Sequence, residues 1–196
     1  MIDIIVDRPT PDAWWYAVKT RSRGEKVAAT MIDALGINHF LPLAPELRQW
    51  SDRKQVVKLP LFPGYLFVRM NPSKESVLPV LRVPGVVGIV GNHAGPLPIP
   101  DYEIEGVRRV LEHGVQCAPH PFLKEGDRVR IVRGALAGVE GTLIRSNSET
   151  RLAISIEMIQ RSISVSVSRQ DVEPVADDEV RSICFTESAI TIADGG

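Results

Sequence analysis

The pattern of apolar and polar positions divides the chain into two folded units. In the first unit, an aromatic run at 14–18 predicts a strand. The helix expected next is predicted to start at a capping box formed by Ser22 and Glu25 and to end at Gly36. Its apolar residues recur at helical spacing, namely Val27, Ala28, Met31, Ile32 and Leu35. A strand followed by an amphipathic helix therefore opens this unit.

Further strands of the first unit are predicted at 37–43, 59–68 and 85–90, with a turn and a short helix or irregular segment at 71–80. The stretch 44–58 is predicted to form a protruding basic loop or hairpin, and a last helix begins at Asp101 and ends at Gly114. This order of elements is typical of an α+β fold, in which helices flank one side of an antiparallel sheet.

The second unit contains short alternating strands and glycine turns. Alternation at 128–132, 152–158 and 163–167 predicts strands, and together with the glycine turns it predicts a small β-barrel of the SH3-like kind. Serines alternate with β-branched residues in the last of these segments, which disfavours a helix. We therefore expect a constitutive barrel.

These patterns predict five segments along the chain. They are a leader at 1–12, a first domain at 13–114, a proline-bearing linker at 115–122, a barrel at 123–175 and an acidic tail at 176–196.

Charge and composition narrow the class of protein. The formal net charge of −1 argues against a protein that coats nucleic acid with its whole surface, although a local basic face remains compatible with it. The sequence shows no signal pattern and no apolar run of membrane-spanning length, which points to the cytoplasm and away from a membrane partner. Cys117 and Cys184 stand far apart and are expected to be reduced thiols. Without an oligomerising heptad, the default is a monomer.

Catalytic chemistry is not indicated. The histidines are scattered without metal-ligand spacing, and no nucleophile elbow, phosphate loop or dinucleotide fingerprint is present. We expect neither an enzyme nor a bound cofactor or metal.

The aromatic strand at 59–68 carries the most informative pattern. Pro63 and Gly64 predict a stiff corner, because proline fixes one backbone angle and glycine frees the next. In the strand that follows, Tyr65 and Phe67 share one face and alternate with residues of the other face. One face can fill a core while the other offers aromatic surface to a partner. Core packing of each ring is the alternative interpretation.

Two motifs carry a resemblance to a known family. The segment 126–134 and the glycine-rich 136–143 resemble the KOW motif of small SH3-like barrels. The segments 15–20, 61–68 and 83–86 look, in that order, like the N-terminal (NGN) domain of NusG. The resemblance covers residues 14–175. The insert at 48–54 and the segment 119–123 resemble the RfaH-like and UpxY-like antiterminators, which are specialised paralogues of NusG.

The resemblance implies a transcription elongation factor that binds the clamp helices of the largest subunit of RNA polymerase. The matching positions for this dock are Trp15, Tyr16, Phe62, Pro63, Tyr65 and Phe67. A contact on the opposite side of the DNA channel is expected at Ser76, Val77 and Leu78.

The same resemblance implies contact with the non-template DNA strand. The candidate residues are Lys19, Arg21, Arg23, Arg48, Trp50, Arg53 and Lys54. A solvated basic loop is the alternative interpretation.

The barrel is expected to recruit a small-subunit ribosomal protein or the termination factor Rho through Leu136 and Ile159. Suppression of pausing or termination is the function that the resemblance implies. Two alternatives stay open: a housekeeping NusG that promotes Rho-dependent termination, and a KOW-type RNA-binding protein of the translation apparatus.

Overall fold

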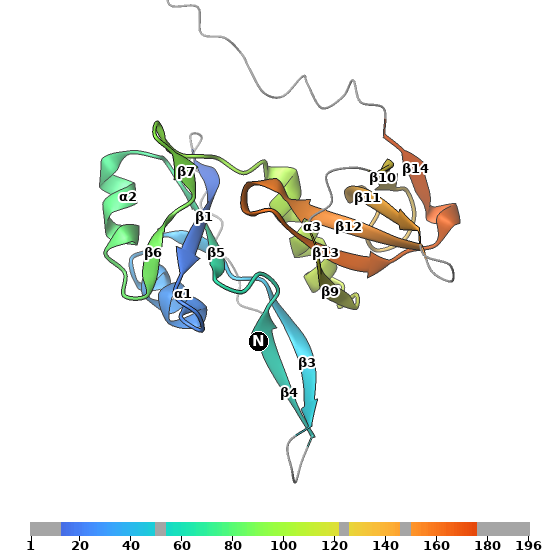
Figure 1. Cartoon of the computed structure of the whole chain (residues 1–196), viewed down its shortest axis with the longest axis horizontal. Helices are drawn as coiled ribbons and strands as arrows, with labels where there is room; N and C mark the ends of the chain where they lie inside the picture. The colour runs from blue at the N-terminus through green and yellow to red at the C-terminus, as the bar shows by residue number, and fades with distance from the viewer. Residues whose placement is uncertain (1–12, 50–53, 122–125, 146–149, 176–196) are drawn as a thin grey trace, which may run out of the picture.

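The computed structural model of the chain describes residues 13–49, 54–121, 126–145 and 150–175. Figure 1 shows two units that lie side by side, with helix α3 between them. The N-terminal unit runs from β1 to α3, and the C-terminal unit comprises β9 to β14. The leader at 1–12 and the tail at 176–196 lie outside the described residues.

The N-terminal unit is built on a four-stranded antiparallel sheet of order β2-β5-β1-β6. Its strands are β1 (Trp14–Thr20), β2 (Asn38–Phe40), β5 (Tyr65–Met70) and β6 (Val86–Ile89). Ala17 pairs with Phe67 and Lys19 with Tyr65, so the predicted aromatic strand lies beside the first strand of the chain.

Helices cover both faces of this sheet, whereas the sequence predicted helices on one side. One face packs against α1 (Glu25–Ala34) and α2 (Lys74–Leu81), through an apolar cluster that contains Tyr16, Leu66 and Val80. The opposite face contributes Trp15 and Phe67 to a second cluster, which also contains apolar residues of α3 (Asp101–Glu112). Alternation along β1 and β5 therefore sends neighbouring side chains to different helices.

Helix α1 begins differently from the prediction. Gly24 is its N-cap residue and has no side-chain cap, so the predicted capping box is wrong. The end of the helix is as predicted, because Gly36 takes a positive φ of 70° immediately beyond it. Ala28 and Ile32 face the sheet as predicted, whereas Val27, Met31 and Leu35 are exposed.

Two small two-stranded sheets complete the N-terminal unit. The strands β3 (Leu43–Gln49) and β4 (Lys54–Pro60) form a long hairpin that projects away from both units (Figure 1). Of the predicted protruding loop or hairpin, the structure has the hairpin. The shorter pair is β7 (Gly91–Asn92) with β8 (Gly95–Pro96), and it leads to α3.

The C-terminal unit is a six-stranded antiparallel sheet of order β14-β10-β11-β12-β13-β9. Its elements are β9 (Cys117–Pro121), β10 (Arg128–Ile131), β11 (Glu140–Arg145), β12 (Thr150–Ile156), η1 (Glu157–Ile159), β13 (Arg161–Ser166), η2 (Arg169–Asp171) and β14 (Val172–Pro174). Among the described residues, no pairing between β14 and β9 closes this sheet into a barrel.

Strand β9 occupies the segment that the sequence predicts to be a linker. It pairs with β13, so that Pro119 lies opposite Ile163 and His120 opposite Ser162. Because prolines are tolerated on edge strands, the two prolines of this segment do not prevent pairing. The connector between α3 and the sheet is thereby reduced to residues 113–116.

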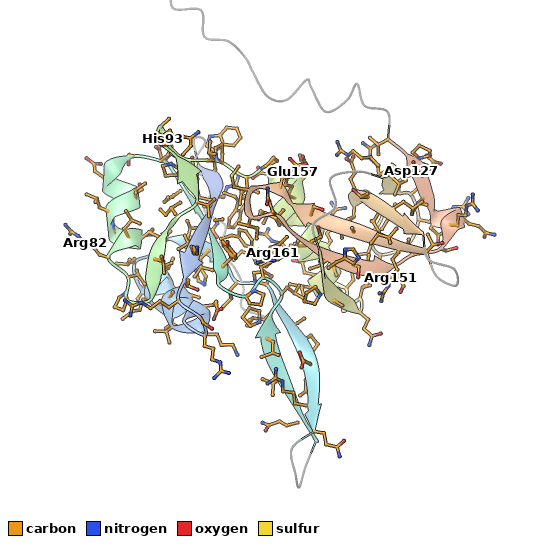
Figure 2. The ribbon with its side chains drawn as sticks, viewed as in Figure 1. Arg82, His93, Asp127, Arg151, Glu157 and Arg161 are labelled. Atoms are coloured by element: carbon orange, nitrogen blue, oxygen red, sulfur yellow. The ribbon has the colours of Figure 1, made fainter. Side chains whose placement is uncertain are left out.

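One apolar cluster, which we call the joint core, spans both units. From the N-terminal unit it contains Trp15, Ala17, Phe40, Leu61, Phe62, Phe67, Ile99, Ile104, Val107 and Val110. From the C-terminal unit it contains Val129, Ile131, Leu136, Val139, Leu152, Ile154, Ile156, Ile159, Ile163 and Val165. Figure 2 shows side chains filling the space between the two units, with Glu157 on the side of the C-terminal unit that faces α3. The two units are thus packed as one body.

Candidate functional site

The corner at Pro63 and Gly64 is fixed by hydrogen bonds on both sides of Gly64. The backbone N–H of Gly64 donates to the Glu25 carboxylate at 2.7 Å, and its carbonyl accepts from the N–H of Thr20 at 2.8 Å. Gly64 has a φ of 85°, a conformation that side-chain-bearing residues rarely adopt. The turn that presents Pro63 and Tyr65 is therefore anchored to the start of α1 and the end of β1.

Most rings of the predicted polymerase dock are buried in this structure. Phe62 and Phe67 are at most 1% exposed and meet edge to face, with ring centroids 5.9 Å apart. Trp15 is 2% exposed, and Tyr16 is equally buried but on the opposite face of the sheet. Of the six predicted positions, Pro63 is exposed and Tyr65 is half-buried. The accessible part of the dock is thus the turn itself.

Two arginines lie near the ring of Trp15. The guanidinium carbon of Arg69 lies 5.9 Å from the ring centroid, and that of Arg108 on α3 lies 5.7 Å from it. Arg108 also lies 5.7 Å from the centroid of Phe40. These cation–π contacts connect α3 to the aromatic face of the sheet.

The predicted nucleic-acid residues lie in two separate groups. Lys19 is exposed near the end of β1, and Arg21 and Arg23 are exposed between β1 and α1. Arg48 is exposed on the hairpin, where its guanidinium donates to Glu46 at 3.2 Å. Lys54 begins β4, and Trp50 and Arg53 lie outside the described residues.

The predicted gate-side residues lie on α2. Leu78 is 47% exposed, and Ser76 and Val77 are half-buried. The hydroxyls of Ser73 and Ser76 lie 3.3 Å apart at the start of this helix. The group is therefore mainly apolar toward solvent.

The predicted partner-binding residues of the second unit, Leu136 and Ile159, are each only 7% exposed and belong to the joint core. The loop before Leu136 turns at Gly134, and Gly138 follows it, both at positive φ, as the glycine pattern predicts. The same packing therefore buries residues predicted to face two different partners.

Besides the apolar residues of α3 in the joint core, three further residues of this helix contact the C-terminal unit. The Glu103 carboxylate accepts a hydrogen bond from the N–H of Glu157 at 3.1 Å, and the Arg109 guanidinium donates to the carbonyl of Ala137 at 2.7 Å. Between them lies Gly106, where an added Cβ would lie 3.2 Å from a methyl group of Ile154. The absence of a side chain at 106 permits the close approach.

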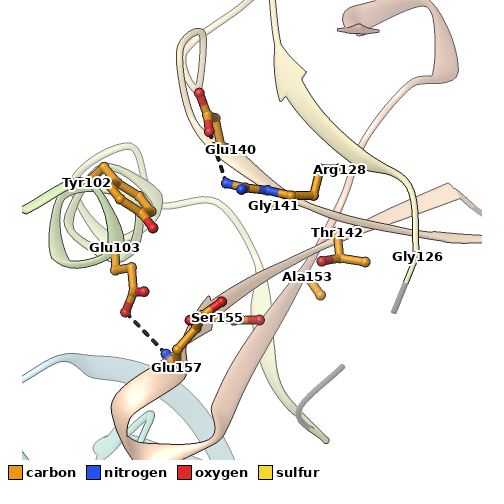
Figure 3. A pocket seen from close by; sticks show the side chains of 10 residues that line it. All are labelled: Tyr102, Glu103, Gly126, Arg128, Glu140, Gly141, Thr142, Ala153, Ser155 and Glu157. Atoms are coloured by element: carbon orange, nitrogen blue, oxygen red, sulfur yellow. Dashed lines mark hydrogen bonds and ion pairs between the residues drawn. The ribbon is translucent and has the colours of Figure 1, made fainter. Parts of the chain in front are cut away.

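A pocket of about 230 Å³ lies beside this contact, as Figure 3 shows. Charged groups from both units line it, among them Glu103, Arg128, Glu140 and Glu157. Arg128 pairs with Glu140 at 3.4 Å, and Glu140 also accepts from Arg130 at 2.8 Å. Burial raises the pKa of Glu103 from 4.5 to about 7, even though the Glu157 N–H favours its ionised form.

Sequence reasoning did not identify Glu25, Glu103, Gly106, Arg108 or Arg109 as functional residues. A signal exists for Gly106, because a glycine inside a helical pattern indicates either a cost in stability or a close approach. Glu25 was predicted as part of a capping box, and its contact with the distant Gly64 could not be read from local spacing.

No helix in the described part of the chain is both long and apolar enough to cross a membrane. Within those same ranges, no group of three or more His, Cys, Asp or Glu side chains could hold a metal ion.

Comparison with known proteins places these elements in one family. Residues 13–108 match the family model described as transcription termination factor nusG. NusG of Thermus thermophilus, named a transcription termination/antitermination protein, is 37% identical over 157 residues that cover 69% of this chain and 83% of the relative. The corresponding protein of Pseudomonas aeruginosa is 27% identical over 173 residues, or 82% of this chain and 98% of that one.

The solved structure "Domain interaction in Thermotoga maritima NusG" resembles this chain with a TM-score of 0.50 and 23% sequence identity. The match covers 84% of this chain and 98% of that one, and it supports the α+β arrangement with a C-terminal antiparallel sheet. Because these proteins are transcription factors without enzymatic activity, the expectation that the chain is not an enzyme is confirmed. The chain belongs to the NusG family of transcription termination/antitermination proteins.

Proposed function

We propose that this protein binds elongating RNA polymerase through its N-terminal unit and suppresses pausing or termination as a specialised antiterminator of the RfaH-like or UpxY-like type. The observation that carries the polymerase contact is the corner at Pro63 and Gly64, which is held by hydrogen bonds on both sides and presents Tyr65 beside an exposed proline. A preorganised aromatic turn suits docking, because little side-chain entropy is lost when a partner binds. The clamp helices are the proposed target.

The specialised type is supported by the hairpin and by two side chains of the C-terminal unit. The hairpin carries Arg48 away from the body of the molecule, where it can reach the non-template DNA strand. Leu136 and Ile159 are aliphatic at the positions proposed to recruit a ribosomal protein or Rho, and the unit is proposed to close as an SH3-like barrel. A housekeeping factor would instead stimulate Rho-dependent termination.

The test is binding of the full chain to an assembled elongation complex. Tyr65→Ala should weaken binding about tenfold or more, because truncation of an aromatic anchor typically costs about 2 kcal/mol. Trp14→Ala is the matched control, since Trp14 is 52% exposed in the neighbouring strand and lies outside the proposed dock. It should bind like the original chain.

Equal binding by the Tyr65 variant would overturn the assignment of the dock. An original chain that binds free structured RNA tightly and ignores the elongation complex would favour the translation-apparatus alternative. A transcription reaction started from the same elongation complex, with Rho added, separates the two polymerase-binding types. Only the housekeeping type should increase Rho-dependent termination.

A further inference from the structure

The contact between α3 and the C-terminal unit contains one buried carboxyl group. Glu103 is 5% exposed, and its carboxylate reaches across the contact to the backbone N–H of Glu157 (Figure 3). None of the ion pairs found among the described residues includes Glu103. The contact therefore holds a group whose charge is removed from water without an opposite charge against it.

The charged and titratable groups around Glu103 come from three elements of the C-terminal unit and from α3 itself. Glu157 of η1 repels a negative charge there, and Arg128 of β10 attracts one but is already paired with Glu140 of β11. On α3, the neighbouring Tyr102 lines the same pocket and stays neutral, because burial raises the pKa of its hydroxyl further above 10.0. Desolvation therefore outweighs the attraction, and the pKa of Glu103 rises to about 7.

We propose that Glu103 makes the contact between the two units proton-dependent, so that its protonation holds them together and its ionisation releases them. This inference rests on the proposed function, because what the contact regulates is access to the partner-binding residues. Leu136 and Ile159 belong to the joint core together with Val107 and Val110 of α3, so separation of α3 from the C-terminal unit removes packing that buries them.

The sign follows from proton binding in the two states. When α3 separates from the C-terminal unit, Glu103 returns to water and to its ordinary pKa of 4.5, whereas in the contact its pKa is about 7. The packed state thus binds more protons between these values, and rising pH favours separation through that window. Above it the opening constant, which is the equilibrium constant for separation of α3 from the C-terminal unit, levels off. Between pH 6 and pH 8 the constant should rise about tenfold.

The experiment measures separation directly, without polymerase. Backbone ¹⁵N relaxation of the full chain reports whether the two units tumble as one body or independently. Gly106→Ala is used as the background, because its Cβ would lie 3.2 Å from a methyl group of Ile154, which must shift for the contact to stay closed, and we expect a larger open fraction. In this background the open fraction should rise from pH 6 to pH 8 and then level off.

Two further variants isolate Glu103. Glu103→Gln, which is neutral at every pH and still offers an oxygen to the Glu157 N–H, should stay packed and lose the pH dependence. Glu112→Gln removes a carboxylate from an exposed position at the end of the same helix and should behave like the background. The proposal is overturned if the opening constant of the background does not change with pH, or if Glu103→Gln shows the same change.

A parallel measurement of binding to the elongation complex separates this inference from the proposed function. If opening responds to pH as expected but no variant binds polymerase, the proton dependence stands and the proposed dock is wrong. If binding is strong and opening is insensitive to pH, the dock stands and the role of Glu103 is wrong.

Discussion

At the scale of single residues, two buried glutamates in the first turns of two helices make structurally different contacts. Glu25 and Glu103 are each 5% exposed, and each accepts a hydrogen bond from a backbone N–H far away in the sequence. The partner of Glu25 is Gly64 in the same unit, whereas the partner of Glu103 is Glu157 in the other unit. The first contact therefore shapes a binding turn, and the second joins two units.

We expect Glu25→Ala to lower the free energy of unfolding by about 1–3 kcal/mol, because the Gly64 N–H loses its acceptor in a partly buried site. Glu25→Gln keeps an acceptor oxygen and should therefore lower the free energy of unfolding by clearly less. Urea denaturation followed by tryptophan fluorescence measures both. Equal losses in the two variants would show that the hydrogen bond does not account for the effect.

The residue scale is also where sequence reasoning was least complete. The two faces of the aromatic strand were predicted correctly, because alternation along a strand depends only on local geometry: Phe67 lies in the joint core and Leu66 in the other cluster. The role of Glu25 was missed because its partner is 39 residues away. A local motif with the right spacing, Ser22 and Glu25, pointed to the wrong hydrogen bond.

At the scale of elements, the junction between β1 and α1 concentrates positive charge. Lys19, Arg21 and Arg23 follow one another there, all exposed, and the Lys26 ammonium donates to the carbonyl of Lys58 at the hairpin. Arg23 takes a φ of 62°, a left-handed conformation that a non-glycine residue seldom adopts. The junction and the base of the hairpin are thus tied together on one side of the unit.

Replacing Lys19 and Arg21 together with glutamine should reduce the salt dependence of binding to single-stranded oligothymidylate. The slope of log K against log salt should fall by about 0.7 for each phosphate that is no longer neutralised, and so by about 1.4 for the pair. Arg161→Gln with Arg169→Gln removes the same charge from exposed positions of the C-terminal unit. If this control pair changes the slope equally, the effect comes from net charge and not from the junction.

Element prediction succeeded where a strong local signal agreed with the fold. The strand at β1 and the helix α3 were predicted near their observed positions, and for α2 and the hairpin the observed structure is one of the two alternatives that the sequence left open. Strand β9 was missed because its two prolines suggested a linker, and only its place at the edge of the sheet makes them acceptable. Edge position is a tertiary property, which the sequence does not display.

At the scale of the whole molecule, the connector decides how far the two units can separate. Residues 113–116 are all that lies between α3 and β9, and when extended they span about 14 Å at most. The contact that they support could not be predicted from the sequence, since it depends on residues of α3 meeting β12, η1 and a loop of the other unit. Gly106 is the local signal, because a glycine inside a helical pattern can indicate a close approach to another element.

Lengthening the connector should loosen the contact. Insertion of twelve glycine and serine residues after Gly114 makes it about four times longer, which costs about 1.2 kcal/mol of loop-closure free energy and should raise the opening constant roughly eightfold. Relaxation measurements at pH 6, where the contact is tighter, provide the test. An unchanged constant would mean that the short connector does not contribute to holding the units together.

The position of β9 and β13 in the chain has a consequence for the protein during its synthesis. Helix α3 is complete at Glu112, but the last strand that pairs with β9 ends only at Ser166. At the usual rate of translation the ribosome needs about 3–10 s to make that stretch. Until β13 has been made, the nascent chain lacks the complete C-terminal unit that packs against α3. Each newly made molecule therefore passes through a stage in which the C-terminal unit does not yet cover α3, and the contact forms only afterwards.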